Sequence, residues 1–183
     1  PIYVQNLTVS NQTAGTFTAD GIETINLTSS TTKSTLAAVT TGAGAAAELT
    51  SLKVSGDADL KITASVDFKA GTADGDTTID ATLDASTFTG KLTVDLADAN
   101  DIQATGGTGA DTFAFGATLS KYDIIDGGDG IDTVSITGHT GTTALKMSDL
   151  QLTSVETFKV TGTGGQVTNV NSDSATPTTY TLV

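Results

Sequence analysis

Two short stretches of the chain combine glycine and aspartate at the same spacing. "GGTGADTFAF" (106–115) and "GGDGIDTVSI" (127–136) both fit GGxGxDxUx, where U is a large apolar residue. Glycine permits a tight turn with exposed carbonyl groups, and the aspartate adds a carboxylate where the turn ends. Since Ca²⁺ prefers about six to eight oxygen ligands of both kinds, the pattern favours a site for a hard cation. The alternative is that the glycines serve only to form tight turns.

We call residues 106–111 the first turn and residues 127–132 the second turn. A repeat of about nine residues per half-coil puts equivalent turns about 18 residues apart, whereas Asp111 and Asp132 are 21 residues apart. Asp123 begins a degenerate copy of the motif nine residues before Asp132, so the three surplus residues lie in the segment 116–122. This phase predicts that the two turns stack on the same side of adjacent coils, with Asp123 on the opposite side.

A calcium ion between the two turns would take oxygen ligands from both of them. The expected carboxylate ligands are Asp111, Asp126, Asp129 and Asp132. The expected carbonyl ligands are Gly106, Thr108, Gly127 and Asp129. Asp123 is a weaker source of ligands, because its turn lacks glycines. The acidic turn 95–101 adds Asp95, Asp98 and Asp101, for which a calcium site and a solvated turn are equally supported.

The elements that must position these residues are short β-strands. Apolar residues alternate with Thr, Lys or Ser in many short runs separated by Gly, Asp, Asn or Ser, which is the pattern of half-buried strands. The chain is therefore predicted to be all-β. The expected strands include 2–10, 23–29, 52–56, 60–68, 91–96, 111–115, 132–138, 156–162 and 178–183.

Imperfect repetition predicts how these strands are arranged. Residues 21–30 and 153–162 share the string Glu-Thr-apolar-x-apolar-Thr, and repeated strand-plus-turn units are typical of solenoids. We therefore expect one irregular, right-handed parallel β-solenoid over residues 1–183. Its predicted parts are irregular coils (1–105), calcium turns (106–135) and further or capping coils (136–183). The Ala-rich segment 34–51 departs from the pattern: a short helix around 43–49 and a tight coil both remain open. A helical turn is also expected near 144–150.

Composition excludes several classes of function. The formal net charge is −13, so nucleic acids and anionic membranes would be repelled. Without cysteine there is no disulfide framework or thiolate metal site. No apolar run is long enough for a membrane-spanning helix, so we expect no membrane insertion. No signal peptide is visible, and the start at Pro1 favours a processed chain or an excised fragment.

No group of residues predicts catalysis. Asp80 and Asp84 form a carboxylate pair, but pairs are inevitable among so many aspartates, and Trp, a platform for sugars, is absent. The chain has no arginine, and its one histidine, His139, lies in a Gly- and Thr-rich stretch typical of an exposed loop. We therefore expect a protein that is not an enzyme.

The first and second turns resemble the calcium-binding nonapeptides of RTX (repeats-in-toxin) proteins. The flanking segments 49–62, 79–96 and 102–113 are similar to RTX-type surface-layer proteins and large adhesins of Gram-negative bacteria. In those proteins irregular solenoid coils lead into calcium-binding repeats, and the layers assemble only with calcium. The match is specific over 106–135 and loose over the flanks. Because only two nonapeptides are complete, the resemblance implies a calcium-clipped solenoid rather than a long β-roll.

This resemblance also implies a function. We expect a Ca²⁺-stabilised structural module of a secreted surface-layer protein, located at the bacterial cell surface and exported by type I secretion. It would self-assemble into a lattice or filament, with the polar ends 1–10 and 176–183 as candidate pairing edges, and a cell-surface polysaccharide is a further possible partner. The alternatives are a calcium-rigidified adhesin or ligand-binding module, and an accessory domain of a secreted RTX enzyme.

Overall fold

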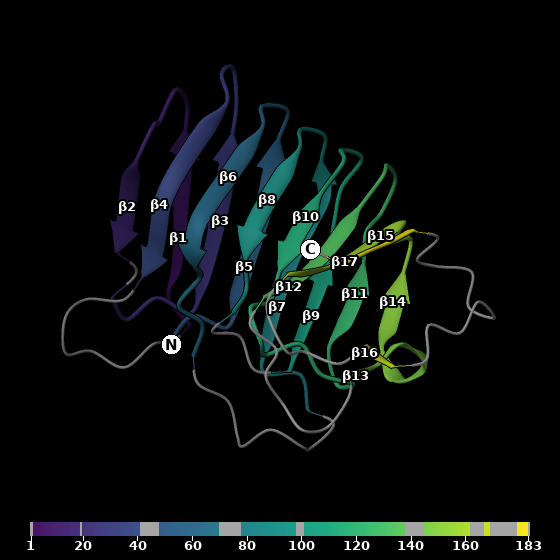
Figure 1. The fold of residues 1–183 in the computed structure, drawn as a ribbon. Helices are drawn as coiled ribbons and strands as arrows, with labels where there is room; N and C mark the ends of the chain where they lie inside the picture. The colour runs from purple at the N-terminus through teal and green to yellow at the C-terminus, as the bar shows by residue number, and fades with distance from the viewer. Residues whose placement is uncertain are drawn as a thin grey trace.

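The protein is a parallel β-solenoid whose strands alternate between two sheets (Figure 1). The computed structural model describes residues 2–18, 20–40, 48–69, 78–97, 101–137, 145–161, 167–168 and 179–182. Sheet A has seven strands in the order β1 (Val4–Val9), β3 (Thr24–Ser29), β5 (Ser51–Gly56), β7 (Ala81–Phe88), β9 (Ile102–Thr105), β11 (Ile124–Asp126) and β14 (Gln151–Thr153). Sheet B has eight, in the order β2 (Gly15–Thr18), β4 (Ser34–Thr40), β6 (Leu60–Ser65), β8 (Leu92–Asp95), β10 (Thr112–Ala114), β12 (Thr133–Thr137), β15 (Thr157–Thr161) and β17 (Thr179–Leu182).

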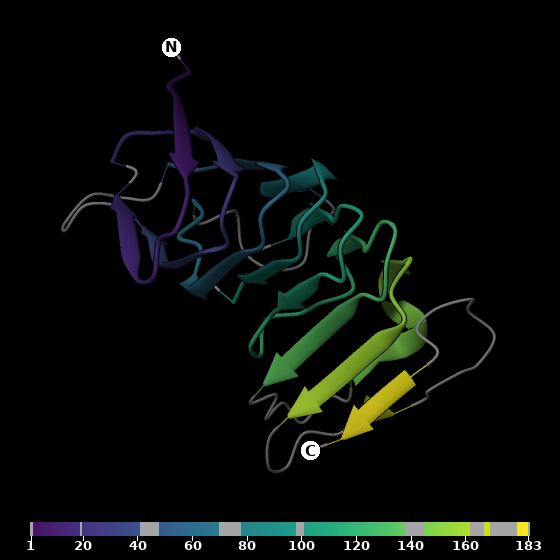
Figure 2. The ribbon, with the colours of Figure 1, turned by 90° about the horizontal axis from the view of Figure 1, so that it is seen from above.

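Each coil runs through a strand of sheet A, a short turn, and a strand of sheet B before it returns to sheet A. The turns from sheet A to sheet B form a row along the top of Figure 1. Figure 2 shows the coils following one another from the N-terminus to the C-terminal strands. A small third sheet pairs β13 (Leu145–Lys146) with β16 (Val167–Thr168), and a 3₁₀ turn, η1, spans Met147–Asp149.

The core lies between the two sheets and is built from the alternation seen in the sequence. In sheet A, Ile25, Leu52 and Leu83 are aligned in register on neighbouring strands, and all three are buried. In sheet B, Phe113 is buried between Val94 and Val134 in the same manner. Since parallel strands keep equivalent residues one above the other, each coil buries its apolar face mainly on its two neighbours.

The structure confirms the predicted parallel β-solenoid, and each strand range expected from the sequence overlaps an observed strand. The helical turn expected near 144–150 is η1. The strand ranges named from the sequence did not include β2, β4, β7, β9, β11, β13, β14 or β16. Of these, β4 occupies the first part of the Ala-rich segment, where its Leu36 and Val39 are buried in the core. Residues 41–47, which hold most of the possible helix, lie outside the described residues. Within the described ranges, no helix is long and apolar enough to cross a membrane.

Candidate metal centre

The first and second turns lie in adjacent coils, both on the side where sheet A passes to sheet B. Thr112 of β10 is aligned with Thr133 of β12, so Asp111 and Asp132 occupy equivalent positions. Two backbone bonds join the turns: Asp129 N–H donates to the carbonyl of Gly107 and Thr133 N–H to that of Asp111, each at 2.9 Å. The stacking predicted from the spacing is therefore confirmed.

The glycines of these turns are required by the close approach of neighbouring coils. A Cβ atom at Gly106 would overlap the carbonyl oxygen of Gly127, and one at Gly127 would overlap that of Ser154. Gly128 also has a φ of +87°, a conformation that favours glycine. The glycine pattern therefore has a structural role that does not depend on a bound cation.

Asp111, the aspartate that ends the first turn, has both carboxylate oxygens occupied by backbone amides. Its Oδ1 accepts a hydrogen bond from Leu92 N–H in the preceding coil, and its Oδ2 accepts one from Gly107 N–H, each at 2.8 Å. The side chain is fully buried. Burial raises the pKa of Asp111, and these two hydrogen bonds oppose the rise. The Asp111 carboxylate therefore accepts hydrogen bonds from backbone amides of two coils.

Asp132, its counterpart in the second turn, is paired at only one oxygen. Its Oδ1 accepts a hydrogen bond from Asp111 N–H at 2.7 Å, whereas its buried Oδ2 has no hydrogen-bond partner among the described residues. Burial raises the pKa of Asp132 to about 6, and the negative charges of Asp111, Glu156 and Asp126 contribute to this rise. Removing a carboxylate from water penalises its charged form. A nearby positive charge would therefore stabilise the charged form of the Asp132 side chain.

One contact recurs along the solenoid at the residue that precedes a strand. An acidic side chain there accepts the backbone N–H of the equivalent residue in the preceding coil. Besides the two contacts of Asp111 and Asp132, the described residues include Tyr3 to Glu23 (2.7 Å), Ile102 to Asp123 (3.0 Å) and Asp132 to Glu156 (2.8 Å).

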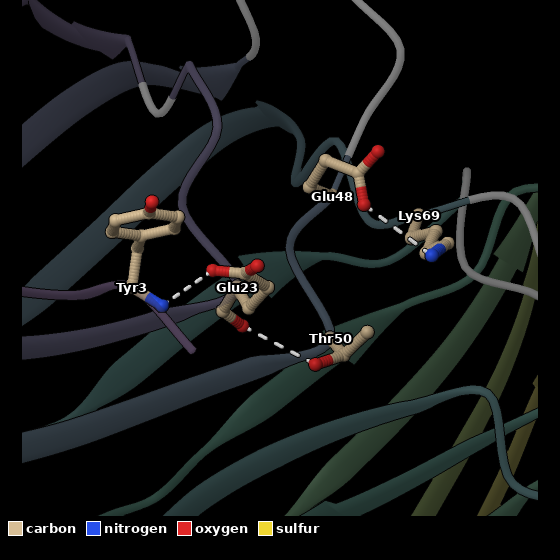
Figure 3. Close-up of polar contacts among 5 residues, drawn as sticks. All are labelled: Tyr3, Glu23, Glu48, Thr50 and Lys69. Carbon is tan, nitrogen blue, oxygen red and sulfur yellow. Dashed lines mark hydrogen bonds and ion pairs between the residues drawn. The ribbon is translucent and has the colours of Figure 1, made fainter. Parts of the chain in front are cut away.

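Figure 3 shows the first of these contacts, in which the backbone nitrogen of Tyr3 points to the carboxylate of Glu23. The carbonyl oxygen of Glu23 in turn accepts a hydrogen bond from the Thr50 hydroxyl at 3.3 Å. Sequence reasoning found the Glu-Thr string of Glu23 and Glu156 as a repeat, but it missed that Glu156 takes the position of Asp132 in the next coil. The shared position, one residue before an apolar-alternating strand, is the signal that could have revealed it.

The other predicted ligands lie in different parts of the solenoid. Thr108 and Asp129 have exposed side chains in the first and second turns. Asp101 and Asp123 lie in the opposite row of connections, where burial raises the pKa of Asp123 and the charge of Asp101 adds to the effect. Asp95 ends β8 and accepts a hydrogen bond from Ala97 N–H at 3.0 Å. Asp98 and His139 lie outside the described residues.

The oxygen atoms near Asp132 are of the types that bind a hard cation, but the side chains alone do not form a complete set of ligands. A buried carboxylate oxygen and closely stacked carbonyl groups are the ligand types that calcium takes. However, across the part of the chain that the structure describes, no three His, Asp or Glu side chains form a group that holds a metal ion by itself. A cation at this position would therefore depend on backbone carbonyl oxygens as well.

Comparisons with known proteins do not extend this description. No family model, curated protein or solved structure matches the chain. The fold is a parallel β-solenoid that is compatible with an RTX-like β-roll.

Proposed function

We propose that the protein is a calcium-stabilised, non-enzymatic structural module of a secreted bacterial cell-surface protein of the surface-layer type. The observation that carries the proposal is Asp132, whose buried Oδ2 has no hydrogen-bond partner within the described ranges. It lies in a row of stacked turns that also holds Asp111 and Glu156. The resemblance of both turns to RTX nonapeptides supports calcium as the cation.

Charge provides the mechanism of stabilisation. The chain carries a formal net charge of −13, and the carboxylates of Asp111, Asp132 and Glu156 occupy equivalent positions in successive coils. When bound, a divalent cation supplies the positive charge that offsets their mutual repulsion. Sites of extracellular modules typically bind calcium with dissociation constants of about 10⁻⁴–10⁻³ M. Such sites stay empty at low cytoplasmic calcium and stabilise the fold by mass action outside the cell.

Apolar groups at the N-terminal coil support the proposal that copies of the chain associate. Strands β1 and β2 lie at the ends of their sheets, with no strand beyond them among the described residues. Ile2, Tyr3 and Val4 are exposed, and Phe17 is only partly buried. Open strand edges with exposed apolar groups favour pairing with another chain. We therefore propose this coil as the contact between copies in a lattice or filament.

Two measurements test the proposal. Thermal unfolding followed by far-UV circular dichroism is compared in calcium and in EGTA, and calcium is expected to raise the midpoint while the spectrum stays β-rich. An unchanged midpoint would contradict calcium stabilisation. Electron microscopy under the same two conditions then separates an assembling module, which forms sheets or filaments, from a monomeric one.

A second candidate function is favoured by a groove on the outer face of sheet A. Its volume is about 360 Å³, and it lies over β5, β7 and β9 beside a register shift in the pairing of β5 with β7. Its polar lining consists of Ser51, Lys53, Thr82, Asp84, Ser86, Gln103 and Thr105. Hydroxyl, amide and charged groups together suit a polyhydroxylated ligand, as a polysaccharide-binding adhesin would need. Binding of bacterial surface polysaccharide that is lost in Lys53→Ala and Asp84→Ala variants would support this function.

A further inference from the structure

The first and second turns have the same sequence pattern but different hydrogen bonds. In the first turn, Gly107 N–H donates to Oδ2 of Asp111 at 2.8 Å. In the second turn, the equivalent amide of Gly128 donates instead to Oδ1 of Asp126, at 3.2 Å. As a result, Oδ2 of Asp132 lacks the donor that its counterpart in Asp111 has.

The two turns also differ in the residue two positions before the second glycine. The pairing of β9 with β11 aligns Thr105 with Asp126, so a neutral residue in one coil is replaced by a carboxylate in the next. This carboxylate captures the Gly128 amide, and Gly128 adopts a φ of +87°. Asp126 therefore makes the second turn different from the first.

Acidic residues of the same coil and of the next coil surround Asp132. Asp126 belongs to the same coil, and Glu156 in the next coil accepts the hydrogen bond of Asp132 N–H at 2.8 Å. The backbone of Ser154 packs so closely on Gly127 that a Cβ there would overlap its carbonyl oxygen. The first turn contributes Asp111, but both of its oxygens already accept backbone amides.

We propose that the cation is held at the second turn, with Asp132 Oδ2 as a direct ligand and with Asp126 and Glu156 supplying further negative charge. Asp111 is a backbone-capping residue and not a ligand. The inference rests on the proposed function, since it specifies where a calcium-stabilised chain holds the ion. It differs from the symmetric site between the two turns that the sequence predicts, and it adds Glu156, which the sequence did not indicate.

The test measures Ca²⁺ affinity by isothermal titration calorimetry and the calcium-induced shift in melting temperature. Asp126→Thr gives the second turn the residue of the first, so Gly128 N–H can return to Asp132. Glu156→Gln retains an oxygen for Asp132 N–H while it removes the charge. Each change is expected to weaken calcium binding about tenfold or more, as loss of supporting groups around a metal commonly does. Asp126→Thr is also expected to raise the melting temperature in EGTA.

Three further variants act as controls. Glu23→Gln removes the same charge from the same type of contact at the distant Tyr3 amide, and it should leave calcium affinity unchanged. Asp111→Asn should lower the melting temperature in EGTA without reducing the affinity. Thr105→Asp, which gives the first turn the acid of the second, is expected to add a second binding event. Circular dichroism in EGTA checks that each variant retains β-structure.

The outcomes separate this inference from the function it rests on. If the wild type binds no calcium, both proposals are wrong. If the wild type binds but Asp126→Thr and Glu156→Gln bind equally well, while Asp111→Asn does not, the cation lies between the two turns. That result would overturn the inference and leave calcium stabilisation intact.

Discussion

The backbone N–H of Asp111 donates to Oδ1 of Asp132 at 2.7 Å, so the equivalent aspartates of the two nonapeptides are joined directly across adjacent coils. The same relationship links Leu92 to Asp111 and Asp132 to Glu156. The carboxylate of the residue before a strand thus accepts the backbone N–H of the equivalent residue in the preceding coil. Because a buried amide without an acceptor costs free energy, this acid sets the register of successive coils even without a cation.

The first prediction concerns the capping role of Asp111. Asp111→Ala leaves the amides of Leu92 and Gly107 without their acceptor, and each loss costs about 1–3 kcal/mol. We therefore expect the free energy of unfolding in EGTA to fall by about 2–6 kcal/mol, measured by urea denaturation. Asp59→Ala is the matched control, because the exposed Asp59 carboxylate accepts a single backbone hydrogen bond, from Lys91 N–H, among the described residues. An equal, small effect of both substitutions would show that the capping contacts contribute little.

The second prediction concerns the spacing of coils at Gly127. In Gly127→Ala the added methyl group would overlap the carbonyl oxygen of Ser154 and lie 2.6 Å from Asp132 Oδ2. Because backbone must move to relieve the overlap, we expect destabilisation of about 3 kcal/mol or more. Gly15→Ala is the control, since the nearest atom to its added methyl group is Gln12 Oε1 at 3.4 Å. A melting temperature of Gly127→Ala equal to that of the control would contradict the close stacking.

The fold could be predicted from the sequence because solenoid coils repeat local patterns. Period-2 alternation located strands such as β1 and β12, and counting from Asp111 to Asp132 placed the two turns on one side. Strand β4 escaped prediction because its small residues, in a stretch rich in Ala and Gly, gave weak alternation. Burial of Leu36 and Val39 against the neighbouring coils decides its conformation, and such contacts are not visible in a local sequence pattern.

The candidate site could be predicted only in part, since identical motif letters conceal different hydrogen bonds. The pattern GGxGxDxUx treats Asp111 and Asp132 as equivalent, whereas the amide of the second glycine donates to Asp111 in the first turn and to Asp126 in the second. Glu156 belongs to a coil without the glycines, so motif matching passes over it. The strand register between β12 and β15 shows that it is the equivalent of Asp132.

The third prediction concerns association through the N-terminal coil. Val4→Lys places a charge on the exposed edge strand β1, and charged side chains on edge strands oppose pairing with another chain. We expect calcium-dependent assembly, followed by light scattering and electron microscopy, to be lost while the melting temperature stays within about 1 °C. Gln103→Lys adds the same charge on a central strand of sheet A and should assemble as the wild type does. Assembly of Val4→Lys at the wild-type level would exclude this edge as the contact.

The fourth prediction is a dependence of stability on pH that calcium removes. Burial and the neighbouring carboxylates raise the pKa of Asp132 to about 6, against about 3.9 in an unfolded chain. The folded chain therefore binds this proton more tightly, so the associated stability is present below about pH 4 and is lost as the pH rises through 6. The raised pKa values of Asp111 and Asp123 act in the same direction. The lowered pKa of Asp84 changes stability only below this window.

In EGTA, the free energy of unfolding is accordingly expected to fall by about 1 kcal/mol between pH 5 and pH 7 for Asp132 alone. Urea denaturation at the two pH values measures it, and Asp132→Asn, which has no proton to lose, should show a smaller decrease. Calcium at pH 7 should restore the lost stability of the wild type, because a cation replaces the proton as the positive charge beside the buried carboxylate. A wild-type stability that rises from pH 5 to pH 7 in EGTA would contradict a raised pKa of this buried carboxylate. If calcium also increases the stability of Asp132→Asn at pH 7, the ion does not bind at this side chain.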